Sequence, residues 1–157
     1  MDLRLYHNSH EFYYRSSFGA VPSGSRLILR LRVSGSDAPN CRARIRLWQS
    51  NVGESFIPMS YEDGVFTGIV AIPPQGCLLW YYFVVDDGHT TVYYGNNYDR
   101  LGGEGAKYPD VPPAYQVTVY DKDAHTPDWF KHAIVYQIFP DRFRHGTRTS
   151  GRLYGKK

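Results

Sequence analysis

Apolar and polar residues alternate in short stretches through the first 120 residues, and turn residues separate these stretches. Across 27–33 the odd positions are Leu or Val, and across 43–47 they are Ala, Ile and Leu with arginines between them. Residues 115–119 alternate in the same way. A two-residue period is typical of strands with one buried face. The pattern predicts an all-β fold, with six to eight antiparallel strands in an immunoglobulin-like β-sandwich.

Two Asp-Gly pairs, at 63–64 and 87–88, predict tight hairpins in this sandwich. A two-residue type I′ turn needs positive φ at both positions, and Asp-Gly is a favoured sequence for it. Two-residue turns at these sites would set three cross-strand pairs: Tyr61 with Phe66, Phe83 with Val92, and Tyr81 with Tyr94.

The pattern changes after about residue 122. Residues 123–131 are polar and predict a linker, in which Thr126 would cap a helical turn with Pro127 at its first position. Residues 133–139 form an apolar run that suits a strand buried on both faces, and charged residues follow it. An apolar strand followed by charged residues is typical of the first strand of a (β/α)₈ barrel. We therefore expect a sandwich at 1–122 and a truncated barrel start at 132–157.

Composition limits the function classes. With 42% hydrophobic residues, the 157-residue chain can fold into one domain, whereas a whole barrel needs about 250 residues. The net charge of +3 is too small for a nucleic-acid surface, and no apolar segment predicts a membrane span. Cys41 and Cys77 predict free thiols. Together with the start Met1-Asp2-Leu3-Arg4, they lead us to expect a cytoplasmic protein.

Several stretches, in this order along the chain, resemble one enzyme family. They are His7-Asn8-Ser9-His10, residues 14–22, residues 29–32, Trp80-Tyr81-Tyr82-Phe83, Tyr94-Gly95-Asn96-Asn97, Leu101-Gly102-Gly103-Glu104-Gly105, and residues 132–143. They resemble the amino-terminal region of the α-amylase family of glycoside hydrolases (glycoside hydrolase family 13), in its neopullulanase, cyclomaltodextrinase and amylopullulanase branch. The resemblance implies that the sandwich is a family-34-like carbohydrate-binding module before a catalytic barrel.

The resemblance also implies what the chain lacks. The family cleaves α-1,4 and α-1,6 glucosidic bonds in starch, pullulan and cyclodextrins, with carboxyl groups from later barrel strands. No residue here is therefore expected to be catalytic. Where the family often has a calcium-binding Asn-Gly-Asp, this chain has His145-Gly146-Thr147, so we predict no metal site and no cofactor.

The implied partners are an α-glucan and the missing barrel, with a homodimer as an alternative. Two rival hypotheses are a free-standing starch-binding module and a non-catalytic immunoglobulin-like interaction domain.

Two tryptophans are the leading candidates for substrate binding. Trp48 falls on the arginine side of its strand, where it could stack on a sugar, cover an interface or simply pack at an edge. Trp80, with Tyr82 and Val84, would form an aromatic face opposite the core residues Leu79, Tyr81 and Phe83. That face could dock onto the barrel or contact a glycan.

Other candidates carry less weight. Tyr136 lies on the predicted barrel strand and would border the substrate, and Asp141 with Arg142 would form an ion pair at the barrel mouth. The segment 94–105 predicts a tight loop with positive-φ residues, or else one that reaches a cleft or holds a cation weakly. His7 and His10 have helical spacing but no partner cluster, so metal binding is not expected there.

Overall fold

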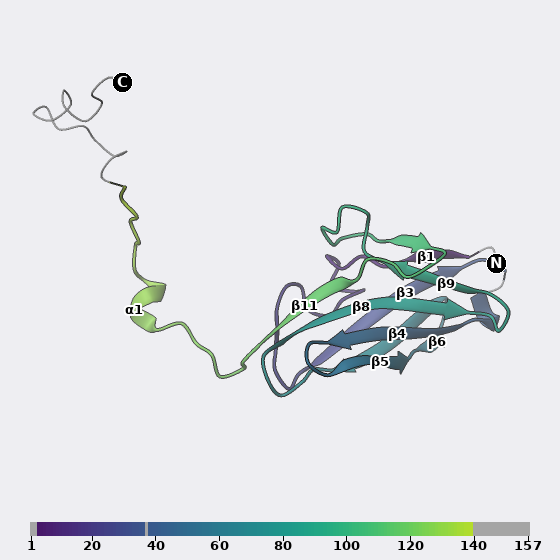
Figure 1. Cartoon of the computed structure of the whole chain (residues 1–157), viewed down its shortest axis with the longest axis horizontal. Helices are drawn as coiled ribbons and strands as arrows, with labels where there is room; N and C mark the ends of the chain where they lie inside the picture. The colour runs from purple at the N-terminus through teal and green to yellow at the C-terminus, as the bar shows by residue number, and fades with distance from the viewer. Residues whose placement is uncertain (1–2, 37, 140–157) are drawn as a thin grey trace, which may run out of the picture. The chain divides into compact units, whose positions relative to one another are not determined.

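The computed structural model describes residues 3–36 and 38–139, which divide into one compact unit up to Ala124 and a second from His125 (Figure 1). Strands dominate the described residues. The elements are β1 Arg4–Tyr6, β2 Val21–Pro22, β3 Arg26–Ser34, a 3₁₀ turn at Ala38–Asn40, β4 Arg42–Gln49, β5 Gly53–Pro58, β6 Ser60–Glu62, β7 Val65–Ala71, β8 Cys77–Asp86, β9 Thr91–Gly95, β10 Ala106–Tyr108, β11 Tyr115–Tyr120 and α1 Asp128–Lys131. The all-β fold class is confirmed.

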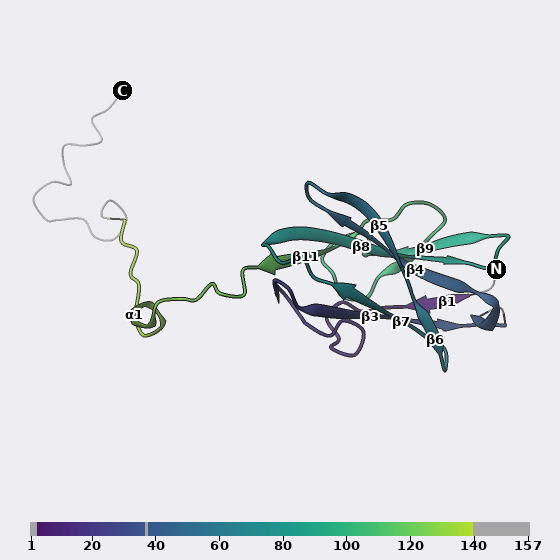
Figure 2. The ribbon, with the colours of Figure 1, turned by 90° about the horizontal axis from the view of Figure 1, so that it is seen from below.

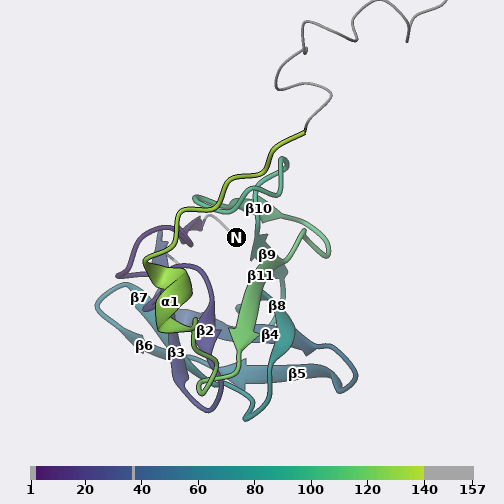
Figure 3. The ribbon, with the colours of Figure 1, turned by 90° about the vertical axis from the view of Figure 1, so that its left-hand side faces the viewer.

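The first unit consists of two sheets packed face to face, as Figures 2 and 3 show from two directions. The smaller sheet has the order β1-β3-β7-β6. The larger sheet is centred on β8, whose one edge pairs with β4, and β4 pairs in turn with β5. The opposite edge of β8 pairs first with β11 and then with β9. β11 and β9 therefore pair with successive parts of the same edge of β8. The larger sheet splits where these two strands separate, at the beginning of β11 and the end of β9.

The inward positions of both sheets form one apolar core. The predicted alternation is confirmed in β3 and β4, where Leu29 and Ile45 are completely buried. The inward residues of β8, with no exposed surface, are Leu79, Tyr81, Phe83 and Val85. Cys41 belongs to this core and Cys77 packs against it, and the structure has no disulfide between them. Burial of these side chains supplies the main stabilising free energy of the unit.

The first predicted hairpin is confirmed. Asp63 and Gly64 both have positive φ, at 46° and 79°, as a type I′ turn requires. Tyr61 lies opposite Phe66, and their ring centroids are 4.8 Å apart. The two-residue turn therefore sets the register that the sequence predicted.

The second predicted hairpin is wrong by two residues. The closing pair is Asp86 with Thr91, so that Phe83 lies opposite Tyr94 and not Val92. The Asp87 carboxylate accepts hydrogen bonds from the backbone N–H groups of His89 and Thr90, at 2.9 and 2.7 Å. These bonds hold a four-residue loop in which Gly88 is the residue with positive φ. A two-residue turn would also have required positive φ at Asp87.

One strand pair departs from the expected antiparallel arrangement. β2 runs parallel to β11, with Val21 opposite Val119 and Pro22 opposite Tyr120. Since β2 has only two residues, it covers only the end of β11. The free edge along the beginning of β11 faces the chain segment that leads into β2.

The second unit contains the short helix α1. Here the helical turn is confirmed, but Pro127 is its N-cap residue and no side chain caps it, so the role predicted for Thr126 is wrong. Residues 133–139 form no strand, and the side chains of Ile134 and Tyr136 are each 82% exposed. A strand needs a hydrogen-bonded neighbour, and no described strand pairs with this segment. The barrel-strand interpretation therefore stays a proposal.

Candidate functional site

The two candidate tryptophans of the sandwich lie side by side on the outer face of the larger sheet. Trp48 on β4 is directly opposite Trp80 on β8, because their neighbours Leu47 and Leu79 point into the core. The indole ring centroids are 5.0 Å apart and the ring planes meet at 62°. Both side chains are half-buried. The structure thus places in contact two residues that the sequence analysis proposed as separate candidates for substrate binding.

Arginines cover the rest of this face. The guanidinium of Arg46 lies 5.2 Å from the ring centre of Tyr82 and also pairs with Glu54 at 2.5 Å. Arg44 lies 5.5 Å from the Phe56 ring centre. Tyr82 is only 6% exposed beneath its arginine, whereas Phe56 is 48% exposed. Phe56 and the half-buried indole pair are therefore accessible aromatic side chains of this face.

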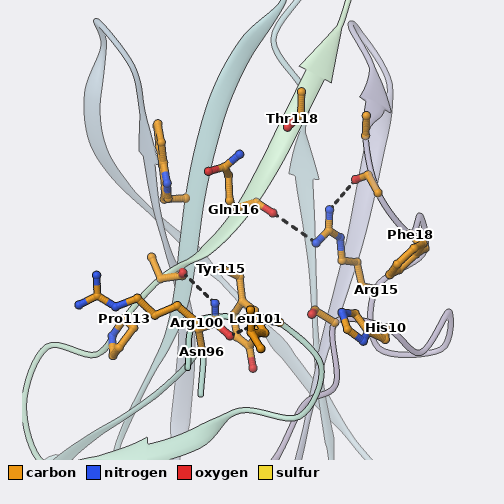
Figure 4. A pocket seen from close by; sticks show the side chains of 16 residues that line it. His10, Arg15, Phe18, Asn96, Arg100, Leu101, Pro113, Tyr115, Gln116 and Thr118 are labelled. Atoms are coloured by element: carbon orange, nitrogen blue, oxygen red, sulfur yellow. Dashed lines mark hydrogen bonds between the residues drawn. The ribbon is translucent and has the colours of Figure 1, made fainter. Parts of the chain in front are cut away.

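A cavity of 620 Å³ opens beside Trp80 (Figure 4). Three chain segments form its walls: residues 9–20, residues 96–102 and residues 113–118 at the start of β11. It lies at the split of the larger sheet, where β9 and β11 separate along the edge of β8. Cavities of a few hundred Å³ with scattered polar groups are typical of small-molecule sites.

Asparagine side chains hold the 96–102 wall. Asn96 Oδ1 accepts a hydrogen bond from the Gly102 N–H at 3.0 Å, and Asn97 Nδ2 donates to the Gly102 carbonyl at 2.6 Å. Arg100, Gly102 and Gly103 have positive φ, which confirms the tight loop expected here. Because the asparagine amides are engaged with the backbone, they are fixed wall elements.

Arg15 forms the wall facing β11. It is 7% exposed, and its guanidinium donates to the carbonyl oxygens of Gly19 at 2.7 Å and Gln116 at 3.4 Å. Figure 4 shows the Arg15 guanidinium pointing toward the backbone carbonyl of Gln116 on β11. Arg15 thus links the free edge of β11 to the segment before β2.

His7 lies in the core near Arg15, and its side chain has no exposed surface. Its Nδ1 is 2.7 Å from the Arg30 carbonyl oxygen and its Nε2 is 3.0 Å from the Tyr81 hydroxyl. Burial lowers the pKa of His7 to about 4, and the charge of Arg15 also lowers it. The same burial raises the pKa of Tyr81 and of Tyr115 far above the usual value. His7 is therefore a neutral core residue.

Among the described residues that line the cavity, none is Asp or Glu, whereas a retaining glycosidase needs two carboxyl groups about 5 Å apart. Residues 3–36 and 38–139 also hold no group of three or more His, Cys, Asp or Glu placed to bind a metal ion. Within the same residues, no helix has the length and apolar character needed to cross a bilayer.

The remaining candidates lie in the second unit or outside the described residues. Tyr136 is in the second unit and largely exposed. Asp141 and Arg142 lie outside the described residues, as do His145 to Thr147. Sequence reasoning missed Arg15 and Gln116 as cavity residues, because their meeting depends on pairings across the whole unit. The Asn-Asn loop at 96–97 was the one visible signal, since Asn and Gly clusters mark fixed loops.

No protein-family model matches the chain. Among curated proteins it is 39% identical to an amylopullulanase of Thermoanaerobacterium thermosulfurigenes over 90% of the chain, and 38% identical to one of Thermoanaerobacterium saccharolyticum over 90%. It is 34% identical to an amylopullulanase of Thermoanaerobacter thermohydrosulfuricus over 97%. The chain is similar to a region of amylopullulanases. It spans only 8%, 12% and 10% of the length of these three amylopullulanases.

Proposed function

We propose that this chain is the amino-terminal region of an α-glucan-acting glycoside hydrolase of the α-amylase family. Its similarity to three amylopullulanases over at least 90% of its length supports this proposal. In this proposal residues 1–122 are an immunoglobulin-like, family-34-like carbohydrate-binding module. Residues 123–131 are a linker, and the exposed run 133–139 is the first strand of the catalytic barrel.

The proposed role of the sandwich is to bind α-glucan at the indole pair and the adjoining cavity. The observation that carries this role is the placement of Trp80, which contacts Trp48 on one side and lines a polar cavity on the other. An indole stacks on the apolar face of a glucose ring. Side-chain amides and hydroxyls such as those of Gln116 and Thr118 suit its hydroxyl groups.

The second candidate role is docking onto the catalytic barrel or onto a second copy. The half-buried state of both indoles and the arginines beside them favour this role, since Trp and Arg are enriched at protein interfaces. The two roles differ in whether the isolated chain retains affinity for soluble starch.

Affinity electrophoresis in gels containing soluble starch tests the binding role. We expect starch to retard the chain, and Trp80→Ala to raise the apparent dissociation constant about tenfold, a loss of about 1.4 kcal/mol, because the stacking surface is removed. Trp48→Ala should weaken binding as well. Trp129→Ala is the matched control, since this indole is 72% exposed in the second unit. Absence of retardation, or equal retardation of all variants, contradicts glucan binding and favours docking.

Hydrolysis is proposed to belong to the rest of the parent enzyme. The purified chain is therefore expected to release no reducing sugar from pullulan or cyclodextrin. Measurable turnover by this chain would contradict the assignment of catalysis to the barrel.

A further inference from the structure

Two buried polar atoms at the cavity have no hydrogen-bond partner. In the part of the chain that the structure describes, the buried side-chain nitrogen and oxygen atoms without a partner are Arg15 Nε and Tyr115 Oη. Both belong to residues that line the cavity beside Trp80. Buried polar groups in folded proteins are nearly always hydrogen-bonded, and each exception calls for an explanation. The Tyr115 hydroxyl lies against Gly105, which is not part of the cavity lining, whereas Arg15 is a wall residue whose positive charge bears on what the cavity can bind.

The charge of Arg15 points to the chemistry of that ligand. Arg15 is only 7% exposed, yet the ion pairs among the described residues are Arg44–Asp86, Arg46–Glu54 and Lys131–Asp128. A buried guanidinium without a counter-charge is costly. Arg15 donates to two backbone carbonyl oxygens and also interacts with the Tyr81 hydroxyl, and these contacts use only part of its five N–H donors.

The surroundings of Arg15 would not repel an anion. The cavity lining contains His10 and Arg100 but, among its described residues, no carboxylate. β11 adds the uncharged hydrogen-bonding side chains of Gln116 and Thr118. N–H groups of a guanidinium that are not used by backbone carbonyls suit the oxygens of a phosphate or carboxylate group.

We propose that this cavity binds a sugar-sized molecule carrying an oxyanion, either a phosphate monoester or a carboxylate, with the oxyanion on Arg15. The volume of 620 Å³ accommodates such a molecule. This inference goes beyond the neutral glucan proposed above, because it assigns a charged group of the ligand to the Arg15 wall of the same cavity.

Proton–nitrogen NMR of the full chain follows the Arg15 Nε–H signal directly. The probes are glucose 6-phosphate, glucuronate, inorganic phosphate and uncharged glucose, titrated at constant ionic strength. We expect a saturable shift of the Arg15 signal with glucose 6-phosphate or glucuronate, and at least tenfold weaker response to glucose. The stronger of the two anionic sugars identifies the phosphate or the carboxylate as the source. No saturable shift with either anion, or an equal response to glucose, overturns the proposal and leaves Arg15 as a link between two backbone segments.

Gln116→Glu provides an independent test that does not remove Arg15. This exposed position of β11 would carry a carboxylate into the cavity, while the Gln116 backbone carbonyl that binds Arg15 stays in place. We expect the affinity for the anionic sugar to fall at least tenfold. Arg26→Gln, at an exposed position on β3 outside the cavity lining, changes the net charge by the same amount and should stay within threefold of the parent chain.

Undiminished anion binding by Gln116→Glu would overturn the proposal. Failure here is separable from failure of the glucan proposal, because starch retardation uses a neutral polymer and reports on Trp80.

Discussion

The free energy of unfolding of the sandwich is expected to fall by about 3 kcal/mol between pH 6.5 and pH 4 through His7 alone. The unfolded histidine titrates near its ordinary pKa of 6.5, whereas burial lowers the folded pKa to about 4. Between these values the unfolded chain binds a proton that the folded chain does not. Stability is therefore complete above pH 6.5 and is lost as the pH falls toward 4.

The hydrogen bonds of His7 explain why the folded ring resists protonation. The Arg30 carbonyl can only accept, so Nδ1 carries the proton and Nε2 accepts from the Tyr81 hydroxyl. A second proton on Nε2 would remove that acceptor beside the charge of Arg15. The other rings facing His7 are uncharged and offer no counter-charge: those of Tyr14, Tyr81, Phe83 and Tyr115.

Urea unfolding at several pH values, comparing the parent chain with His7→Gln, measures this effect. The variant should be less stable at pH 7 and should lose less stability on acidification, so that the two curves converge toward pH 4. His89→Gln is the matched control, because His89 is exposed in the β8–β9 loop. A His7→Gln curve parallel to that of the parent chain over the whole range would disprove the assignment.

Gly105→Ala is expected to lower the free energy of unfolding by about 3 kcal/mol, the upper end of typical overpacking costs. A Cβ atom at this position would overlap the Gly95 carbonyl oxygen and the Tyr115 hydroxyl. Gly95 is held in register against Ala106 in the β9–β10 pair, so the backbone cannot move aside cheaply. The Gly105 N–H also donates to the His7 carbonyl at 3.2 Å.

Thermal unfolding followed by circular dichroism compares Gly105→Ala with Gly88→Ala. At Gly88 a Cβ meets nothing within 4 Å, and the cost comes only from its φ of +89°, about 1 kcal/mol. The steric account requires a clearly larger loss of stability at Gly105. Equal or smaller destabilisation by Gly105→Ala would show that the backbone around Gly105 moves enough to accommodate the added Cβ atom.

Local patterns predicted the parts of the fold that depend on few residues. The alternation in β3 and β4 identified their buried faces, because each side of a strand meets one environment. The Asp63-Gly64 turn set its own register. The length of the turn at Asp87 could not be predicted in the same way. It depends on which backbone N–H groups the Asp87 carboxylate binds, and those are determined only in the folded loop.

The candidate site was predictable only in part. Alternation placed Trp48 on the outer face, but its meeting with Trp80 depends on how β4 and β8 align, and no local signal sets that alignment. The cavity needs three distant segments at once, and Arg15 carries no motif that marks it as a wall residue. His7 was interpreted through its spacing from His10, although its role follows from the rings of Tyr81 and Tyr115 that enclose it.

The parallel pairing of β2 with β11 joins the two ends of the sandwich in sequence. Arg15, just before β2, and Gln116 on β11 are bonded although they are 101 positions apart. Closing so long a segment costs entropy before the contact repays it, and such topologies fold in milliseconds to seconds and not microseconds. During synthesis on the ribosome, β2 and Arg15 cannot form these contacts until β11 has been synthesised. The first unit can therefore complete its hydrogen bonding only after this last strand is available.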